Sequence, residues 1–223
     1  MIKDSKNILV IFAHPDDMEI FMSGTIIKLK KNGYKIYCAI VSDGSKGGIN
    51  KKDIVQIRRK EAIDSAKIID INPIFLNLID SEILYDKESY RLIVNLIDNI
   101  RPDIIFTHNP NDYHSDHRIV SNLVFDSASY KVPVIYVDSI TGINFNPDFY
   151  IDITDEFSLK KKMIFKHKSQ LKSSIYETTK CLNSFRGMQA TGDLNRYAEA
   201  FKYSSKRNYI KIIERLKNII INI

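Results

Sequence analysis

Residues 7–17, NILVIFAHPDD, decide the fold, because an unbroken apolar run passes directly into a cluster of polar side chains. The run from Asn7 to Ala13 has the length and composition of a strand buried on both faces, as in a parallel sheet covered by helices. Pro15 suits the first turn of a helix. Open α/β sheets bind ligands outside the carboxyl ends of their strands. We therefore expect a functional site at residues 14–17.

The rest of the chain continues the alternation of strands and helices. Further strands are predicted at Lys35 to Ser42, Pro73 to Leu78, Asp103 to Thr107 and Pro133 to Val137. Between them, Glu61 to Ile69 and Tyr90 to Ile100 carry apolar residues at helical spacing. Strands that alternate with helices form parallel sheets through right-handed crossovers. The sequence predicts an α/β fold, a Rossmann-like three-layer α/β/α arrangement with a mostly parallel sheet.

Length and composition indicate one domain over residues 1–223, since the chain is 44% hydrophobic and 27% charged. Apolar residues at helical spacing predict a C-terminal amphipathic helix over residues 207–223. Its apolar stripe needs a partner surface, either in this chain or in another subunit of a homo-oligomer. Docking on its own domain is the simpler of the two alternatives.

Cysteine usage and charge exclude several classes of protein. Cys38 and Cys181 form no CxxC pattern, so a disulfide framework and a thiolate metal site are not expected. The early apolar run is too short to span a membrane and lacks the form of a signal peptide. The net charge of +6 comes from scattered lysines and not from a basic stripe interleaved with aromatic residues. We expect a cytoplasmic protein with no membrane and no nucleic-acid partner.

Four of the five histidines follow two of the predicted strands, in residues 14–17 and 108–117. His14 and Asp17 are three positions apart, which places them on one side of a helical turn. A catalytic Zn²⁺ takes three nitrogen or oxygen ligands and keeps one position open for water. His114 or His117 completes the set, with Asp116 adjacent to orient an imidazole. Spacing alone leaves the choice between the two histidines open.

Simpler roles compete with metal binding for some of these residues. Acidic side chains are favoured at helix N-termini, and we assign Glu19 to this role. Capping does not explain a histidine at the end of a strand, so His14 and Asp17 remain predicted ligands. His108 is predicted to be a hydrogen-bonded structural histidine, and spacing does not place His167.

The run from Ala13 to Glu19 resembles the AHPDDxE signature of PIG-L/LmbE-type zinc-dependent N-acetylglucosamine deacetylases, and residues 114–117 resemble their HxDH signature. Other segments are similar to further motifs of that family: Arg58 with Glu61 and Ala62 (RxxEA), Arg101 to Asp103 (RPD), His167 to Gln170 (HxSQ) and Glu199 to Phe201 (EAF). The likeness covers most of the chain in the same order.

This resemblance implies a role for each residue of the site. It implies that Zn²⁺ is held by His14, Asp17 and His117. It further implies that Asp16 is the catalytic base, that His114 polarises the substrate carbonyl with Asp116 holding it, and that Arg58 helps bind the sugar.

The implied reaction removes an N-acetyl group from an N-acetylglucosamine-type sugar or small-molecule sugar conjugate. Two alternatives remain, a zinc amidase for a different small amide conjugate and a metal-binding Rossmann-like module without catalysis. Residues 43–48, DGSKGG, depart from the family, which commonly has an acidic residue after the first glycine. The departure leaves the substrate open, and Lys46 is a candidate contact for an anionic substituent.

Overall fold

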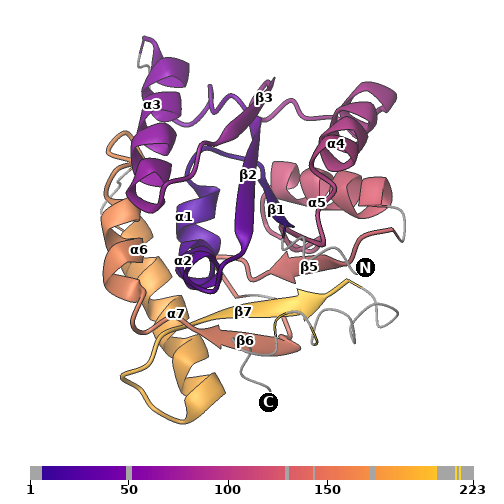
Figure 1. The fold of residues 1–223 in the computed structure, drawn as a ribbon. Helices are drawn as coiled ribbons and strands as arrows, with labels where there is room; N and C mark the ends of the chain where they lie inside the picture. Colours follow the sequence, from indigo (N-terminus) through magenta and orange to yellow (C-terminus); the bar gives the residue numbers. More distant parts are fainter. Residues whose placement is uncertain are drawn as a thin grey trace.

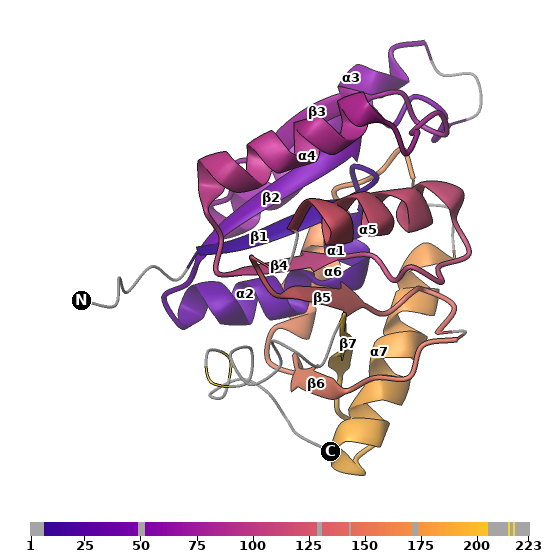
Figure 2. The same ribbon diagram turned by 90° about the vertical axis from the view of Figure 1, so that its right-hand side faces the viewer.

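The structure is a computed structural model, and it describes residues 7–48, 52–128, 131–142, 144–170 and 174–204, together with Glu214 and Leu216 (Figures 1 and 2). Its strands are β1 (Asn7–Phe12), β2 (Lys35–Ser42), β3 (Ile74–Leu78), β4 (Ile104–Thr107), β5 (Val134–Val137), β6 (Phe149–Asp152) and β7 (Ala198–Tyr203). Its helices are α1 (Asp17–Phe21), α2 (Ser23–Lys31), α3 (Ile54–Ala66), the 3₁₀ helix η1 (Lys67–Ile69), α4 (Lys87–Ile100), α5 (Ser115–Ala128), α6 (Phe157–Ile164) and α7 (Ile175–Thr191).

The strands form one seven-stranded sheet in the order β3-β2-β1-β4-β5-β7-β6. The first five strands in this order run parallel, whereas β7 pairs antiparallel with both β5 and β6. The chain moves outward from β1 to β2 and β3, and then returns to place β4 on the other side of β1. This reversal makes the carboxyl ends of β1 and β4 the position where such folds bind ligands.

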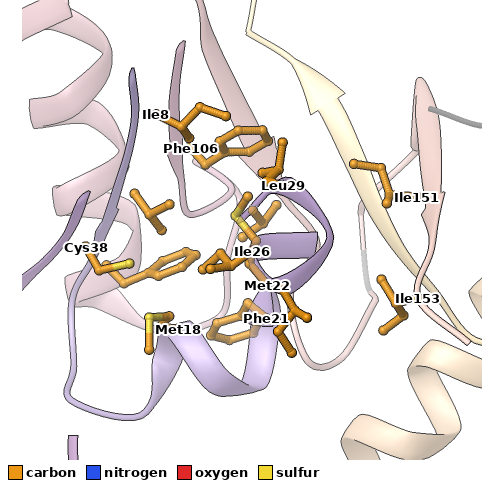
Figure 3. Packing of buried hydrophobic residues seen from close by; sticks show 14 of the residues in the cluster. Ile8, Met18, Phe21, Met22, Ile26, Leu29, Cys38, Phe106, Ile151 and Ile153 are labelled. Carbon is orange, nitrogen blue, oxygen red and sulfur yellow. The ribbon is translucent and has the colours of Figure 1, made fainter. Parts of the chain in front are cut away.

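Successive residues of β1 point to opposite faces of the sheet and enter two separate hydrophobic clusters. Ile8, Val10 and Phe12 pack with α1 and α2. Figure 3 shows Ile8 and Phe106 on the same side of the sheet as Ile26 and Leu29 of α2 and Met22, which lies between the two helices. Leu9 and Ile11 lie on the other face, in the cluster that contains residues of α4 and α5. Helices on both faces of the sheet confirm the predicted three-layer α/β/α fold.

A buried ion pair and two hydrogen bonds join β7, in the antiparallel part of the sheet, to helices α6 and α2. Glu199 of β7 accepts hydrogen bonds from the backbone N–H groups of Gly24 (3.1 Å) and Thr25 (2.7 Å) in the first turn of α2. Its Oε1 also lies 2.6 Å from Nζ of Lys160 in α6. Lys160 and Glu199 are 0% and 2% exposed, so each depends on the other for its charge partner.

All five predicted strands are present. The predicted helix from Glu61 to Ile69 is the later part of α3 together with η1, and the predicted helix from Tyr90 to Ile100 is the later part of α4. Asp86 caps the N-terminus of α4, and its side chain accepts a hydrogen bond from the Ser89 N–H (2.8 Å). The antiparallel strands β6 and β7 were not anticipated. The predicted helix over 207–223 lies outside the described residues except for Glu214 and Leu216, and Leu216 is fully buried in the cluster around Ile8. No helix in the described ranges is long and apolar enough to cross a membrane.

Candidate active site

The loops that follow β1 and β4 meet because these two strands are hydrogen-bonded neighbours. Beside them lies a cavity of about 270 Å³. Its walls contain all but one of the predicted site residues, namely His14, Asp16, Asp17, Arg58, His114 and His117. The same cavity is bounded by apolar and aromatic side chains, Ile20, Phe21, Tyr113, Ile140 and Ile175, and by Lys46, Asp80 and Gln170.

Three electron-pair donor atoms converge at the base of this cavity. Nδ1 of His14 lies 3.1 Å from Nε2 of His117 and 3.3 Å from Oδ2 of Asp17. The same Asp17 oxygen lies 3.5 Å from Nε2 of His117. Ligands of a tetrahedral zinc ion, at about 2.0–2.1 Å from the metal, are separated by about 3.3–3.4 Å. The three separations therefore fit three ligands of a tetrahedral metal ion.

Among the described residues, three other groups of side chains also come within 4.8 Å of one another at their ligand atoms: His14 with His114 and His117, Asp17 with His108 and His117, and His14 with Asp80 and Asp116. Nε2 of His108 accepts a hydrogen bond from the backbone N–H of Ala13 (2.9 Å), so its electron pair is already engaged. Burial and the neighbouring His117 lower the pKa of His108 to about 4. His108 is hydrogen-bonded as predicted.

In both predicted histidine ligands, carboxylates contact the ring nitrogen that is not expected to bind the metal. Nε2 of His14 lies 3.3 Å from Asp116 and 3.4 Å from Asp80, and Nδ1 of His117 lies 3.2 Å from Asp112. Burial opposes the charged imidazole, but the carboxylates of Asp17, Asp116 and Asp80 outweigh it and raise the pKa of His14 well above its usual value. Such carboxylates orient metal-binding imidazoles and fix their tautomer.

The position of Asp116 differs from the one that the resemblance implied. Its carboxylate contacts His14 and accepts a hydrogen bond from the Ser81 N–H (2.8 Å), whereas its link to His114 runs through its own backbone N–H. Asp116 is in the first turn of α5, where its side chain points across to the β1 loop, so it is placed to orient His14 and not His114.

Asp116 N–H donates to Nδ1 of His114 at 3.2 Å. Because Nδ1 accepts, a neutral His114 carries its proton on Nε2. Burial and the nearby His14 and His117 lower the pKa of His114, which favours this neutral form. Half-buried at the cavity wall, His114 is thus a hydrogen-bond donor through Nε2.

Asp16 is held by Arg58 of α3. Nη2 of Arg58 lies 2.8 Å from Oδ1 of Asp16, and Nη1 donates to the carbonyl of Gly44 at 3.0 Å. Arg58 is only 3% exposed, and Nη1 also lies 3.6 Å from Asp80. The guanidinium therefore links the residues after β1, the glycine loop after β2 and the aspartate after β3.

Glu19 does not serve mainly as the helix-terminus charge that we predicted. It lies in the first turn of α1, but its side chain is buried and Oε2 is 3.2 Å from Nε2 of His167. The tertiary structure thus also places His167, which follows α6 and lies against α1.

Asp80 and Asp112 are functional candidates that the sequence reasoning missed. Asp80 is the second residue after β3, and a search for polar residues at the end of each predicted strand would have found it. Asp112 lies within the second polar loop but has no distinguishing spacing. Its contact with His117 depends on the folding of that loop, in which Asp112 also accepts a hydrogen bond from the His114 N–H (2.9 Å).

Relatives share both the sequence and the fold. A diacetylchitobiose deacetylase from Thermococcus kodakarensis is 28% identical over 196 residues, which cover 78% of this chain and 73% of that protein. The solved structure of an N,N'-diacetylchitobiose deacetylase from Pyrococcus horikoshii has a TM-score of 0.81 at 27% identity and covers 93% of this chain and 86% of its own.

The structure of a 4-carboxy-2-hydroxymuconate hydratase from Pseudomonas putida has a TM-score of 0.79 at 22% identity, covering 90% of this chain and 97% of its own. This likeness shows a common fold, and a fold alone does not determine the reaction. Residues 9–128, which include both histidine loops, match the family PIG-L: GlcNAc-PI de-N-acetylase. Because this match spans more than half of the 223 residues, the chain belongs to the PIG-L family.

Proposed function

We propose that this protein is a zinc-dependent N-deacetylase that removes the acetyl group from an N-acetylglucosamine-type sugar or sugar conjugate. The observation that carries the proposal is the convergence of His14, Asp17 and His117 at distances of 3.1–3.5 Å beside Asp16, in the cavity wall of a PIG-L chain. The relatives named above as diacetylchitobiose deacetylases support the substrate class.

A zinc ion held by these three residues would supply a Lewis acid that lowers the pKa of bound water toward about 7. Asp16 is the base that accepts the proton of the attacking water. One of its oxygens, Oδ1, is engaged by Arg58, which leaves Oδ2 to take the proton. Arg58 thereby orients the base, and its position in the cavity wall also allows a contact with the sugar.

His114 stabilises the negative charge that develops on the acetyl oxygen. Its neutral form presents Nε2–H as a donor, because Nδ1 accepts from the Asp116 N–H. A donor of this kind typically contributes about 3–4 kcal/mol to the transition state. Since Nδ1 is engaged, His114 is poorly suited to become an imidazolium, so we assign protonation of the leaving amine to Asp16.

Acetate release tests this proposal. Purified protein loaded with zinc is incubated with diacetylchitobiose, with glycosides of N-acetylglucosamine, with an N-acetylated amino acid, and with 4-carboxy-2-hydroxymuconate as a hydratase control. We expect acetate from at least one sugar. His14→Ala and Asp17→Ala should lose both zinc and activity. Acetate from the amino acid alone would support the amidase alternative, and zinc-replete protein inactive on all sugars would refute the proposal.

A further inference from the structure

The segment His167–Gln170, which follows α6, contacts three elements that bound the cavity. His167 lies 3.2 Å from Glu19 of α1. Ser169 bonds Glu61 of α3, and Nε2 of Gln170 donates to the carbonyl of Gly47 in the glycine loop. One short segment therefore links the elements that carry Asp16, Arg58 and the loop beside them.

The Ser169 contact is the firmest of the three. Its N–H and Oγ donate to Oε1 and Oε2 of Glu61 at 2.8 and 2.6 Å, so both carboxylate oxygens are engaged. Hydrogen bonds to a charged acceptor are stronger than those between neutral groups. Glu61 is one helical turn after Arg58, so the segment and the guanidinium are anchored to the same part of α3.

This anchoring determines how the Gln170 side chain is oriented. Gly47 O can only accept, so the amide nitrogen must face it, and Nε2 also donates to Oγ of Ser169 at 3.0 Å. Both amide hydrogens are thereby used. No residue in the described part of the chain donates to Oε1, although Gln170 lies in the cavity wall. The oxygen is an acceptor without a protein donor at the edge of the substrate cavity.

Gly47 brings this acceptor close to Arg58. A Cβ atom at Gly47 would overlap the Arg58 guanidinium and would lie 3.1 Å from Oε1 of Gln170. The guanidinium and the amide oxygen thus flank one point of the wall. A hydroxyl group both donates and accepts, so a fixed donor beside a fixed acceptor suits a hydroxylated ring.

We propose that Gln170 determines substrate specificity, with Oε1 accepting a hydrogen bond from a ring hydroxyl of the sugar while Ser169 and Glu61 hold the amide in position. This inference rests on the proposed deacetylase function and adds the residue that recognises the sugar ring. It places the sugar ring between the catalytic groups and the glycine loop, with the acetamide toward His114.

Deoxy analogues of the best substrate from the acetate assay provide the test. We expect removal of one ring hydroxyl to lower kcat/KM of the native enzyme by about 5- to 10-fold, the effect of one neutral hydrogen bond. Gln170→Ala should lower kcat/KM for the parent sugar by a similar factor, mainly through KM, and should lose nothing further on that analogue. Zinc content should be unchanged. Gln56→Ala, at an exposed position of α3, is the matched control.

If Gln170→Ala does not fold, Gln170→Met replaces the amide with a side chain of similar length that cannot accept this hydrogen bond. The inference is overturned if the variant keeps the native preference for every hydroxyl, or if it retains native kcat/KM. A native enzyme that releases no acetate from any sugar would instead refute the proposed function, so the two failures are distinguishable.

Discussion

Replacement of Asp112 should weaken zinc binding although this residue does not reach the metal position. Its Oδ1 lies 3.2 Å from Nδ1 of His117, and it also accepts from the His114 N–H at 2.9 Å. Asp112 is 3% exposed, so water does not readily replace it. In Asp112→Ala, His117 loses the carboxylate beside its Nδ1, the contact that orients the imidazole with Nε2 toward His14 and Asp17.

The expected loss of zinc affinity follows from the type of contact. Removal of a carboxylate that contacts a metal-binding imidazole typically weakens metal affinity by about 10- to 100-fold. This corresponds to about 1.4–2.7 kcal/mol of metal-binding free energy. Asp112→Asn keeps an acceptor oxygen without the charge, so its loss should be smaller than that of the alanine variant.

Competition with a chromophoric chelator at constant pH measures these affinities, and circular dichroism verifies that each variant is folded. Asp98→Asn, on the exposed side of α4, controls for the loss of one negative charge. We expect the affinities to rank native and Asp98→Asn first, Asp112→Asn next and Asp112→Ala last. An alanine variant within twofold of the native affinity would refute the reasoning, because His117 would then need no partner at Nδ1.

Three further changes have separable outcomes. Asp16→Asn should keep zinc but lower kcat by about 10²–10⁴-fold, as for loss of a general base; near-native turnover would exclude that role. His114→Ala should lower kcat by about 10²–10³-fold with zinc content near native, whereas loss of zinc would make His114 a ligand. Lys160→Met leaves Glu199 buried without its partner and should reduce the free energy of unfolding by about 3–5 kcal/mol in urea titrations. Lys162→Met, at an exposed position, should be near neutral, and equal effects of the two would contradict the buried-pair argument.

Much of the fold could be predicted because its signals are local. The five parallel strands are short apolar runs bounded by polar residues, and their alternation with helical periodicity identifies the fold class. β6 and β7 were not predicted because β6 is a short edge strand, and because β7, which lies between β5 and β6, contains the charged residues Glu199 and Lys202. The buried carboxylate of Glu199 is satisfied by α2 and Lys160, which are distant in sequence, so local patterns do not reveal this strand.

The sequence by itself determined that histidines and aspartates gather at the ends of two strands, and the family resemblance supplied the choice of His117 and the role of Asp16. Only the tertiary structure decided the contacts around them. The carboxylate of Asp116 contacts His14, and Arg58 forms an ion pair with Asp16. Three further residues reach the site from separate loops, namely Asp80, Asp112 and Gln170. Spacing along the chain indicates which residues share a strand end or a helix face. The direction of a side chain and the pairing of residues from different loops depend on how separate elements pack against one another. This packing is not evident from the residue at any single position.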